Sequence, residues 1–197
     1  MKNRSALIIA LLLTVTAAFA QTGGYQLGQK VPNFTLKDAQ NKPVSLTDFN
    51  SAKTVVVVFT NTLCAYSKLY ENRLLSLSRS YADKGVRFIF VNPTVSLEEG
   101  GETMQQMAEK QYSIPFLADE NQRISNQFGA TKTPEVFVLH NVNNEFVLKY
   151  KGAIDDNPQV EDYVKDNYLK NAIDAILTNQ TVKGFDKRAT GCMIRKF

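Results

Sequence analysis

A short apolar run that leads through a cysteine into a helix is the sequence feature that most restricts how this chain can fold. Residues 54–59, TVVVVF, are almost entirely apolar, which is typical of a strand buried on both faces of a sheet. From Tyr66 to about Ala82, apolar residues recur at spacings of three and four, which predicts an amphipathic helix. Cys64 lies between the two elements, so we expect it at the helix N-terminus. Unpaired N–H groups and the helix dipole stabilise a thiolate there, and the sequence therefore predicts a reactive thiol.

The remaining predicted elements would build one domain around this strand and helix. Residues 86–91, VRFIFV, form a second buried strand, and two strands joined by a helix should be parallel. The other expected elements are a hairpin over 31–45, a helix capped by Ser96 and Glu99, a strand over 114–117, a helix over 120–128, strands from Pro134 to His140 and over 146–151, and a helix over 160–177. We therefore expect a single domain over residues 21–180, followed by a polar, basic tail over residues 181–197.

The first 20 residues have the pattern of a secretory signal peptide. Lys2 and Arg4 precede an apolar core, and Ala18-Phe19-Ala20 supplies the small residues of a cleavage site. An uncleaved membrane anchor is the alternative, but the apolar core is shorter than the about 20 residues that a span needs. We therefore expect residues 1–20 to be removed after Ala20. The mature protein would be periplasmic or secreted, with no membrane span.

Composition excludes several other classes of function. Without Lys2 and Arg4, 21 basic residues face 19 acidic ones, and no basic stripe carries interleaved aromatic residues, so we expect no nucleic-acid partner. His140 is the only histidine and the two cysteines are far apart, so we expect no metal site. No glycine-rich phosphate loop is present, and we expect no cofactor. A secreted chain with two cysteines can form a disulfide, but a domain of this size does not need one to fold.

Four segments together resemble the secreted, peroxiredoxin-like group of the AhpC/TSA redoxins, which have a thioredoxin-like fold. They are the Cys-Ala-Tyr-Ser turn at 64–67, TPEVFVL at 133–139, GAIDD at 152–156 and the GCMIRK tail at 191–196. The resemblance extends from about Val31 to Leu177. It implies an α/β fold with a central mixed β-sheet flanked by helices and an N-terminal β-hairpin.

Two departures from related families limit the chemistry that the resemblance implies. Thioredoxins have Cys-x-x-Cys at this turn, whereas Ser67 takes the second position here, so dithiol exchange within the motif is impossible. Peroxiredoxins place their reactive cysteine at the position of Ser67 and a threonine at the position of Cys64. The sequence therefore argues against the peroxiredoxin mechanism.

The resemblance also implies roles for other residues of the site. Thr133-Pro134 resembles the cis-proline that faces the active cysteine and offers the preceding backbone to an extended substrate. The alternative is a trans-proline at the start of a strand. Ser67 is expected either to donate a hydrogen bond to the Cys64 sulfur or to be an ordinary first-turn serine. Asn61, in the polar turn, is a further supporting candidate.

The role of Cys192 separates the possible mechanisms. If the tail folds back, Cys192 can resolve a mixed disulfide or sulfenate on Cys64. Equally, a permanent Cys64–Cys192 disulfide would pin the tail and stabilise the fold by roughly 4–5 kcal/mol in the chain-entropy model. A disulfide of Cys192 between two chains is a third, less favoured alternative. The sequence thus predicts a secreted thiol-disulfide oxidoreductase that acts on a protein thiol or disulfide or on a small oxidant. A non-standard thiol peroxidase and a catalytically silent binding or structural domain are the alternatives.

Charged residues elsewhere have simpler expected roles. The Asp155-Asp156 pair can bind a cation or form a salt bridge with Arg73 or with the basic tail, but a solvated loop and helix N-cap is the more common role of such a pair. Glu71 and Arg73 are expected on the helix surface or in pairs within the helix. His140, at a strand end, is expected to be an exposed turn residue. We therefore assign none of these residues a role in catalysis.

Overall fold

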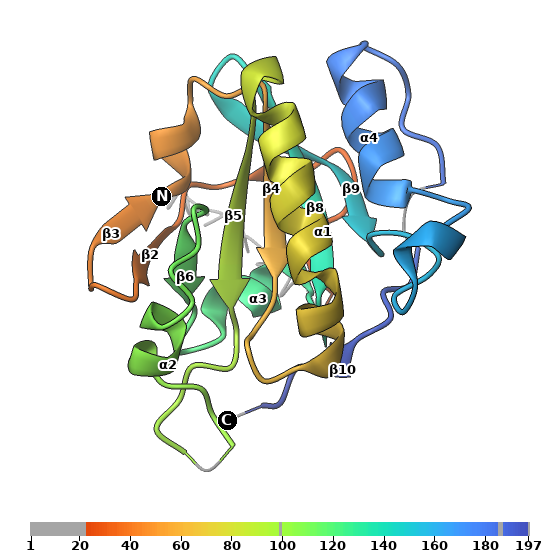
Figure 1. The fold of residues 1–197 in the computed structure, drawn as a ribbon. Helices are drawn as coiled ribbons and strands as arrows, with labels where there is room; N and C mark the ends of the chain where they lie inside the picture. The colour runs from red at the N-terminus through yellow and green to blue at the C-terminus, as the bar shows by residue number, and fades with distance from the viewer. Residues whose placement is uncertain (1–22, 99, 185–186, 197) are drawn as a thin grey trace, which may run out of the picture.

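The structure is a computed structural model that describes residues 23–98, 100–184 and 187–196, so the expected signal peptide lies outside the described residues. Its centre is an eight-stranded mixed sheet with the order β1-β9-β8-β4-β5-β6-β2-β3 (Figure 1). The strands are β1 (Lys30–Val31), β2 (Thr35–Asp38), β3 (Pro43–Ser45), β4 (Thr54–Phe59), β5 (Val86–Asn92), β6 (Phe116–Ala118), β8 (Glu135–Val142) and β9 (Glu145–Gly152). β5 is parallel to β4 and β6, and the other neighbours are antiparallel.

Helices cover both faces of this sheet. α1 (Ala65–Tyr81) and α4 (Tyr168–Leu177) pack on one face, and α3 (Arg123–Phe128) with the short helix η1 (Leu46–Phe49) packs on the other (Figure 1). The remaining helices are η2 (Ala82–Lys84), α2 (Met104–Ala108) and η3 (Glu161–Tyr163). Side chains of β4 alternate between the two cores, with Val56 and Val58 in one and Val55 and Val57 in the other. The predicted central mixed sheet flanked by helices, with a strand buried on both faces, is confirmed.

The N-terminal hairpin is confirmed over a shorter range than expected. β2 and β3 pair with each other at one edge of the sheet. Val31, which we expected in the hairpin, instead lies in β1 opposite Phe146 of β9, at the far edge. The Val31 side chain is buried there. Burial against β9 therefore decides where this residue pairs.

The helix expected after β5 begins later than the sequence suggested. Residues 93–94 form a turn, Val95 forms an isolated β-bridge with Glu102, and the Ser96 hydroxyl accepts the backbone N–H of Glu98. Gly100 has a φ of +81°, a left-handed conformation that an α-helix cannot continue through. α2 starts only at Met104, where Thr103 and Gln106 form the capping box. The prediction that the helix begins at Ser96 was therefore wrong, and Glu99, the other residue of the predicted capping box, lies outside the described residues.

The last helix also begins later than expected. Val160 and Tyr163 are 41% and 69% exposed and do not belong to the apolar face of α4. The Asp156 carboxylate accepts the backbone N–H groups of Lys165 and Asp166, which folds the loop back before the helix starts. From Leu169 onward the predicted apolar face is confirmed. No helix in the described part of the chain combines the length and apolar character that crossing a membrane requires.

Candidate active site at the Cys64 disulfide

Cys64 lies at the N-terminal end of α1, as predicted. It is the N-cap residue of this 17-residue helix, with extended backbone angles, and its side chain is 4% exposed. The Asn61 side-chain carbonyl accepts the N–H groups of Leu63 and Cys64 at 3.1 and 2.7 Å, which fixes the turn. The first N–H groups of a helix have no partner within the helix, and they add to the positive end of its dipole. A thiolate on Cys64 would therefore be stabilised.

Cys192 reaches Cys64 and forms a disulfide with it. The S–S distance is 2.03 Å and the Cα atoms are 5.9 Å apart. The tail strand β10 (Cys192–Met193) pairs antiparallel with β7 (Lys132–Thr133) in a separate two-stranded sheet, and Cys192 lies opposite Thr133. β10 lies beside the N-terminal end of α1 (Figure 1). The tail therefore folds back on the site. This position is what both a resolving role of Cys192 and a permanent Cys64–Cys192 disulfide require.

The peptide bond between Thr133 and Pro134 is cis, as the resemblance implied. Thr133 is fully buried, and its carbonyl oxygen lies 3.1 Å from the Cys64 sulfur. Because a disulfide sulfur carries no hydrogen, this is a close contact; only the reduced thiol could donate a hydrogen bond there. The Asn61 amide donates to the Thr133 hydroxyl at 3.3 Å. Asn61 therefore joins the cysteine turn to the cis-proline segment.

Of the two roles expected for Ser67, the structure shows the ordinary serine of the first helical turn and not the hydrogen bond to the Cys64 sulfur. It is in the first turn of α1 and is 4% exposed. Its hydroxyl oxygen is buried and has no hydrogen-bond partner among the described residues, so the expected bond to the Cys64 sulfur is not formed. The structure thus brings Cys64, Cys192, Asn61 and the Thr133-Pro134 pair together. It leaves Ser67 without a visible contact to the sulfur.

Glu102 supports the cysteine turn, and sequence reasoning missed it. This carboxylate is fully buried and accepts the Thr62 N–H at 3.0 Å and the Thr62 hydroxyl at 2.7 Å. The Glu102 backbone is held in turn by hydrogen bonds with Thr94 and Ser96. Glu102 follows two glycines in a loop, 40 residues from its partner. No local pattern distinguishes it from a solvated loop glutamate.

Glu135 has a similar supporting position next to the cis-proline. Its carboxylate accepts the backbone N–H groups of Thr131 and Lys132 at 2.8 and 3.1 Å. Burial raises the pKa of Glu135 above its ordinary value, although these hydrogen bonds act in the opposite direction. By holding Thr131 and Lys132, Glu135 fixes the segment that receives the tail.

The loop after β9 is anchored on α1 by a buried ion pair. Asp155 is 6% exposed, pairs with the Arg73 guanidinium and accepts the Tyr70 hydroxyl at 2.7 Å. Burial, followed by the hydrogen bond to Asp155, raises the pKa of Tyr70 above its ordinary value. The expected solvated role of Asp155 was therefore wrong, and the Arg73 salt bridge is confirmed. Arg73 does not form the surface or intrahelical pair that we expected.

Glu71 likewise bonds outside its helix. Its carboxylate accepts the Lys110 ammonium at 2.6 Å and the Tyr112 hydroxyl at 2.8 Å, both from the segment after α2. Neither contact could be expected from spacing within α1. These bonds tie α1 to the neighbouring segment on the side away from Asp155.

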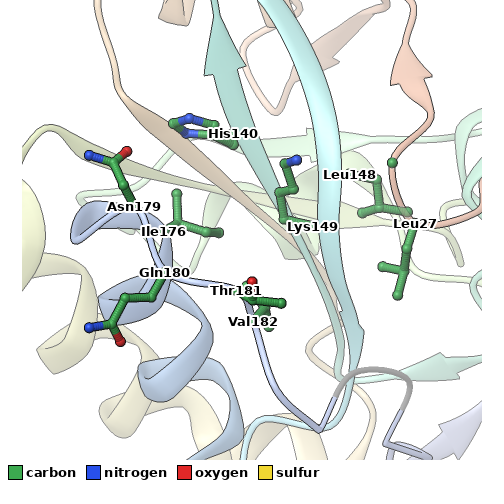
Figure 2. Close-up of a pocket in the computed structure, with 10 residues that line it drawn as sticks. Leu27, His140, Leu148, Lys149, Ile176, Asn179, Gln180, Thr181 and Val182 are labelled. Atoms are coloured by element: carbon green, nitrogen blue, oxygen red, sulfur yellow. The ribbon is translucent and has the colours of Figure 1, made fainter.

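A cavity of about 550 Å³ lies away from the disulfide, beside β9 and the segment after α4. Figure 2 shows His140 and Asn179 on one side of it and Leu27 and Leu148 on the other. Neither cysteine lines it. His140 belongs to β8 and its Nδ1 lies 3.2 Å from the Lys53 carbonyl oxygen, so the expected exposed turn was wrong. The cavity is therefore not part of the thiol site.

A mixed sheet covered by helices, with a cysteine at a helix N-terminus that faces a cis-proline, is a thioredoxin-like fold. The exposed lipoprotein thioredoxin of Streptococcus pneumoniae has this fold. It is 15% identical with a TM-score of 0.55, over 73% of this chain and 99% of that chain. The model of the AhpC/TSA family matches residues 27–157, more than half of the chain. The chain belongs to the AhpC/TSA family.

Two further proteins are similar over a larger share of the chain. The thiol-disulfide oxidoreductase ResA of Bacillus cereus is 26% identical over 167 residues, which are 80% of this chain and 92% of ResA. The crystal structure of a hypothetical protein from Sinorhizobium meliloti has a TM-score of 0.79 at 27% identity. That match covers 89% of this chain and 97% of the other.

Proposed function

We propose that this protein is a thiol-disulfide oxidoreductase in which Cys64 is the nucleophile and Cys192 the resolving thiol. The observation that carries the proposal is the Cys64–Cys192 disulfide itself, which places the only two thiols of the chain within bonding distance at a helix N-terminus. Family membership supports it, as does the similarity to ResA of Bacillus cereus, which is named as a thiol-disulfide oxidoreductase.

In the reduced protein, the Cys64 thiolate attacks a disulfide of the partner. A Cys64–partner bond forms, the partner disulfide breaks, and one partner sulfur leaves as a thiolate that takes a proton from solvent. The Cys192 thiolate then attacks the Cys64 sulfur, which forms the internal disulfide and releases the second partner thiol. Two thiols of the protein are oxidised and one partner disulfide is reduced. The reverse sequence oxidises a partner dithiol, and the relative reduction potentials decide the direction.

The position of the second cysteine explains why Ser67 does not prevent this cycle. In a Cys-x-x-Cys turn, the second thiol sits one helical turn away on the same element. Here Cys192 approaches from another segment, held opposite Thr133. The resolving thiol is therefore on a tail that can leave when the disulfide opens, whereas a cysteine at position 67 could not.

We also propose that residues 1–20 direct export and are removed, so that the domain over 21–180 and the tail over 181–197 act in the periplasm or outside the cell. The basic, apolar and small-residue pattern of residues 1–20 supports this location. So does the disulfide, because such bonds persist in oxidising compartments. The expected partners are protein thiols and disulfides.

The two cysteine variants test the proposal. Cys64→Ser should abolish reduction of a model protein disulfide, and Cys192→Ser should retain the first attack and accumulate a mixed disulfide with the partner, visible on a non-reducing gel. Ser80→Ala, on the exposed side of α1, is the matched control and should behave as the wild type. Unchanged reductase activity in Cys64→Ser would rule the proposal out.

A further inference from the structure

The tail strand β10 meets β7 through its backbone. Cys192 lies opposite Thr133 in antiparallel register, and the Ile194 N–H donates to the Thr131 carbonyl oxygen at 2.9 Å. The Met193 side chain between them is 70% exposed. Backbone hydrogen bonds of this kind give affinity without requiring a particular side chain. β7 can therefore pair with another extended polypeptide that enters in the same register.

One position of the tail is restricted by the space available. A Cβ atom on Gly191 would lie 2.3 Å from the Thr133 carbonyl oxygen and 3.2 Å from the Pro134 nitrogen. Both are backbone atoms, and Thr133 is fully buried, so they cannot move aside as a flexible side chain would. The residue directly before the disulfide cysteine must therefore be glycine if this register is to be kept.

Two side chains of the domain bind the tail backbone on either side of this position. The Lys132 ammonium donates to the Ala189 carbonyl oxygen at 2.9 Å, and the Gln122 amide donates to the Arg195 carbonyl oxygen. Both acceptors are main-chain atoms. These donors would serve any polypeptide that runs in the same direction, whereas the position of Gly191 would admit only glycine.

We propose that the tail is a tethered copy of the partner polypeptide, and that the reduced protein binds partners through an extended segment containing a Gly-Cys dipeptide. The partner segment takes the place of Gly191 to Ile194, with its glycine against Thr133. This inference rests on the proposed function, and it adds the sequence class of the substrate. Tail and partner exclude each other, because both need the same face of β7 and the same Cys64 sulfur.

The reaction of a bound partner balances as two displacements. In the reduced protein, the Cys64 thiolate attacks the partner cysteine of a disulfide, a Cys64–partner disulfide forms, and the other partner sulfur leaves as a thiolate that takes up a proton. The number of disulfides does not change in this step. The Cys192 thiolate then attacks the Cys64 sulfur, the internal disulfide forms, and the partner cysteine leaves as a thiolate while the tail takes its place.

A peptide series on the full chain tests this inference. The protein is the Cys192→Ser variant, with its fold checked by far-ultraviolet circular dichroism. The probes are the peptide TGCMIRK, copied from residues 190–196, and its Gly191→Ala and Thr190→Ala versions, each carrying thionitrobenzoate on its cysteine. Attack by the Cys64 thiolate on the peptide sulfur releases the coloured thionitrobenzoate anion. The mixed disulfide of cysteamine with thionitrobenzoate, which has no peptide backbone, measures the reactivity of Cys64 alone.

The Gly191→Ala peptide should react roughly tenfold more slowly than TGCMIRK, as expected for forced overpacking against rigid backbone, and the Thr190→Ala peptide should match TGCMIRK. Equal rates for the glycine and alanine peptides, with fast reaction of the cysteamine probe, would overturn this inference and leave the proposed function standing. A cysteamine rate no faster than that of free cysteine would overturn the proposed function.

A second measurement does not depend on the Cys192→Ser variant. After reduction of the full chain, the internal disulfide should re-form more slowly in Gly191→Ala than in Thr190→Ala, which changes an exposed neighbour in the tail. Equal rates of re-formation would also contradict the inference, because the tail is then not held in the register that excludes a Cβ atom.

Discussion

At the scale of single residues, Asn61 holds together the parts of the site that the chain brings from different places. Its carbonyl oxygen accepts two N–H groups of the cysteine turn, and its amide reaches the hydroxyl of Thr133. A side chain that bonds in both directions fixes the distance between the cysteine turn and the cis-proline. We therefore treat Asn61 as a positioning residue that does not itself touch the reacting sulfur.

Asn61→Ala should lower the free energy of unfolding by about 1–3 kcal/mol, because two backbone donors lose their acceptor. Asn61→Asp keeps the acceptor and loses only the donor to Thr133, so its loss should be smaller. Denaturant unfolding of the oxidised proteins measures both. An alanine variant as stable as the wild type would show that water replaces Asn61 without cost.

Residues with a local pattern could be predicted, and residues with only distant partners could not. Cys64 follows a buried strand and precedes an amphipathic helix, so its place at a helix N-terminus follows from neighbours in sequence. Pro134 precedes an apolar strand in a recognisable segment. Glu102 acquires its role from the backbone and hydroxyl of Thr62, which lies 40 residues earlier in the chain. Its own sequence surroundings are those of an ordinary surface glutamate.

At the scale of elements, α1 is held at both sides by charged groups that its own sequence does not explain. The Arg73 and Asp155 side chains are 12% and 2% exposed, so both charges are removed from water. Glu71 bonds to Lys110 and Tyr112 on the opposite side. These contacts position the helix that carries Cys64 relative to the loop after β9 and the segment after α2.

Arg73→Met should destabilise the protein by about 3–5 kcal/mol, because it leaves the buried Asp155 carboxylate without its cation. Adding Asp155→Asn should recover part of this loss, since the unpaired charge is then gone and an acceptor for Tyr70 remains. Arg79→Met, at an exposed position of the same helix, should change stability by less than about 0.5 kcal/mol. Denaturant midpoints compare the four proteins. Similar losses of stability in Arg73→Met and Arg79→Met would show that the buried Arg73–Asp155 pair does not stabilise the fold.

Three tyrosines that donate to carboxylates around α1 predict a loss of stability at alkaline pH. Burial first, and then the hydrogen bonds to Asp155, Asp174 and Glu71, raise the pKa of Tyr70, Tyr81 and Tyr112 respectively. A tyrosine hydroxyl in the unfolded chain ionises near pH 10. Above about pH 10 the unfolded state therefore loses these hydroxyl protons while the folded state still keeps them. Stability from these groups is therefore complete below about pH 10 and falls as the pH rises toward their folded pKa values.

Unfolding by guanidinium chloride at about pH 8 and about pH 11 tests the predicted loss of stability at alkaline pH. The Tyr112→Phe variant should be less stable than the wild type at the lower pH and should lose less on going to the higher pH. Tyr163→Phe, at a position that is 69% exposed, is the control. Equal pH dependence in the wild type and the Tyr112→Phe variant would exclude a contribution from Tyr112.

The elements with strong periodicity could be predicted, whereas several boundaries could not. β4 and α1 follow from an apolar run and from spacings of three and four. The starts of α2 and α4 depend on Gly100 and on the Asp156 carboxylate, which interrupt or delay a helix whatever its apolar pattern. Apolar residues before a helix, such as Val160, therefore look helical in the sequence and are not.

At the scale of the whole molecule, the C-terminal tail brings the second cysteine of the chain to the candidate site. It runs back across the domain, its cysteine bonds to Cys64, and its strand pairs with β7. Neither the pairing with β7 nor the place of β1 at the far edge of the sheet could be obtained from local patterns, because both are contacts between distant segments. From the sequence alone, Cys192 could be either a resolving thiol or half of a permanent disulfide with Cys64.

The reduction potential of the Cys64–Cys192 disulfide distinguishes these alternatives most directly. The helix N-terminus favours the thiolate of Cys64, and the tail that carries Cys192 presents mostly exposed side chains, so the reduced state should be accessible. Equilibration with dithiothreitol or glutathione buffers, followed by thiol counting, should give a potential above about −300 mV, within the range of exchanging disulfides. A potential well below about −300 mV, with no change in activity when both cysteines are replaced, would show a permanent structural bond and contradict the proposed function.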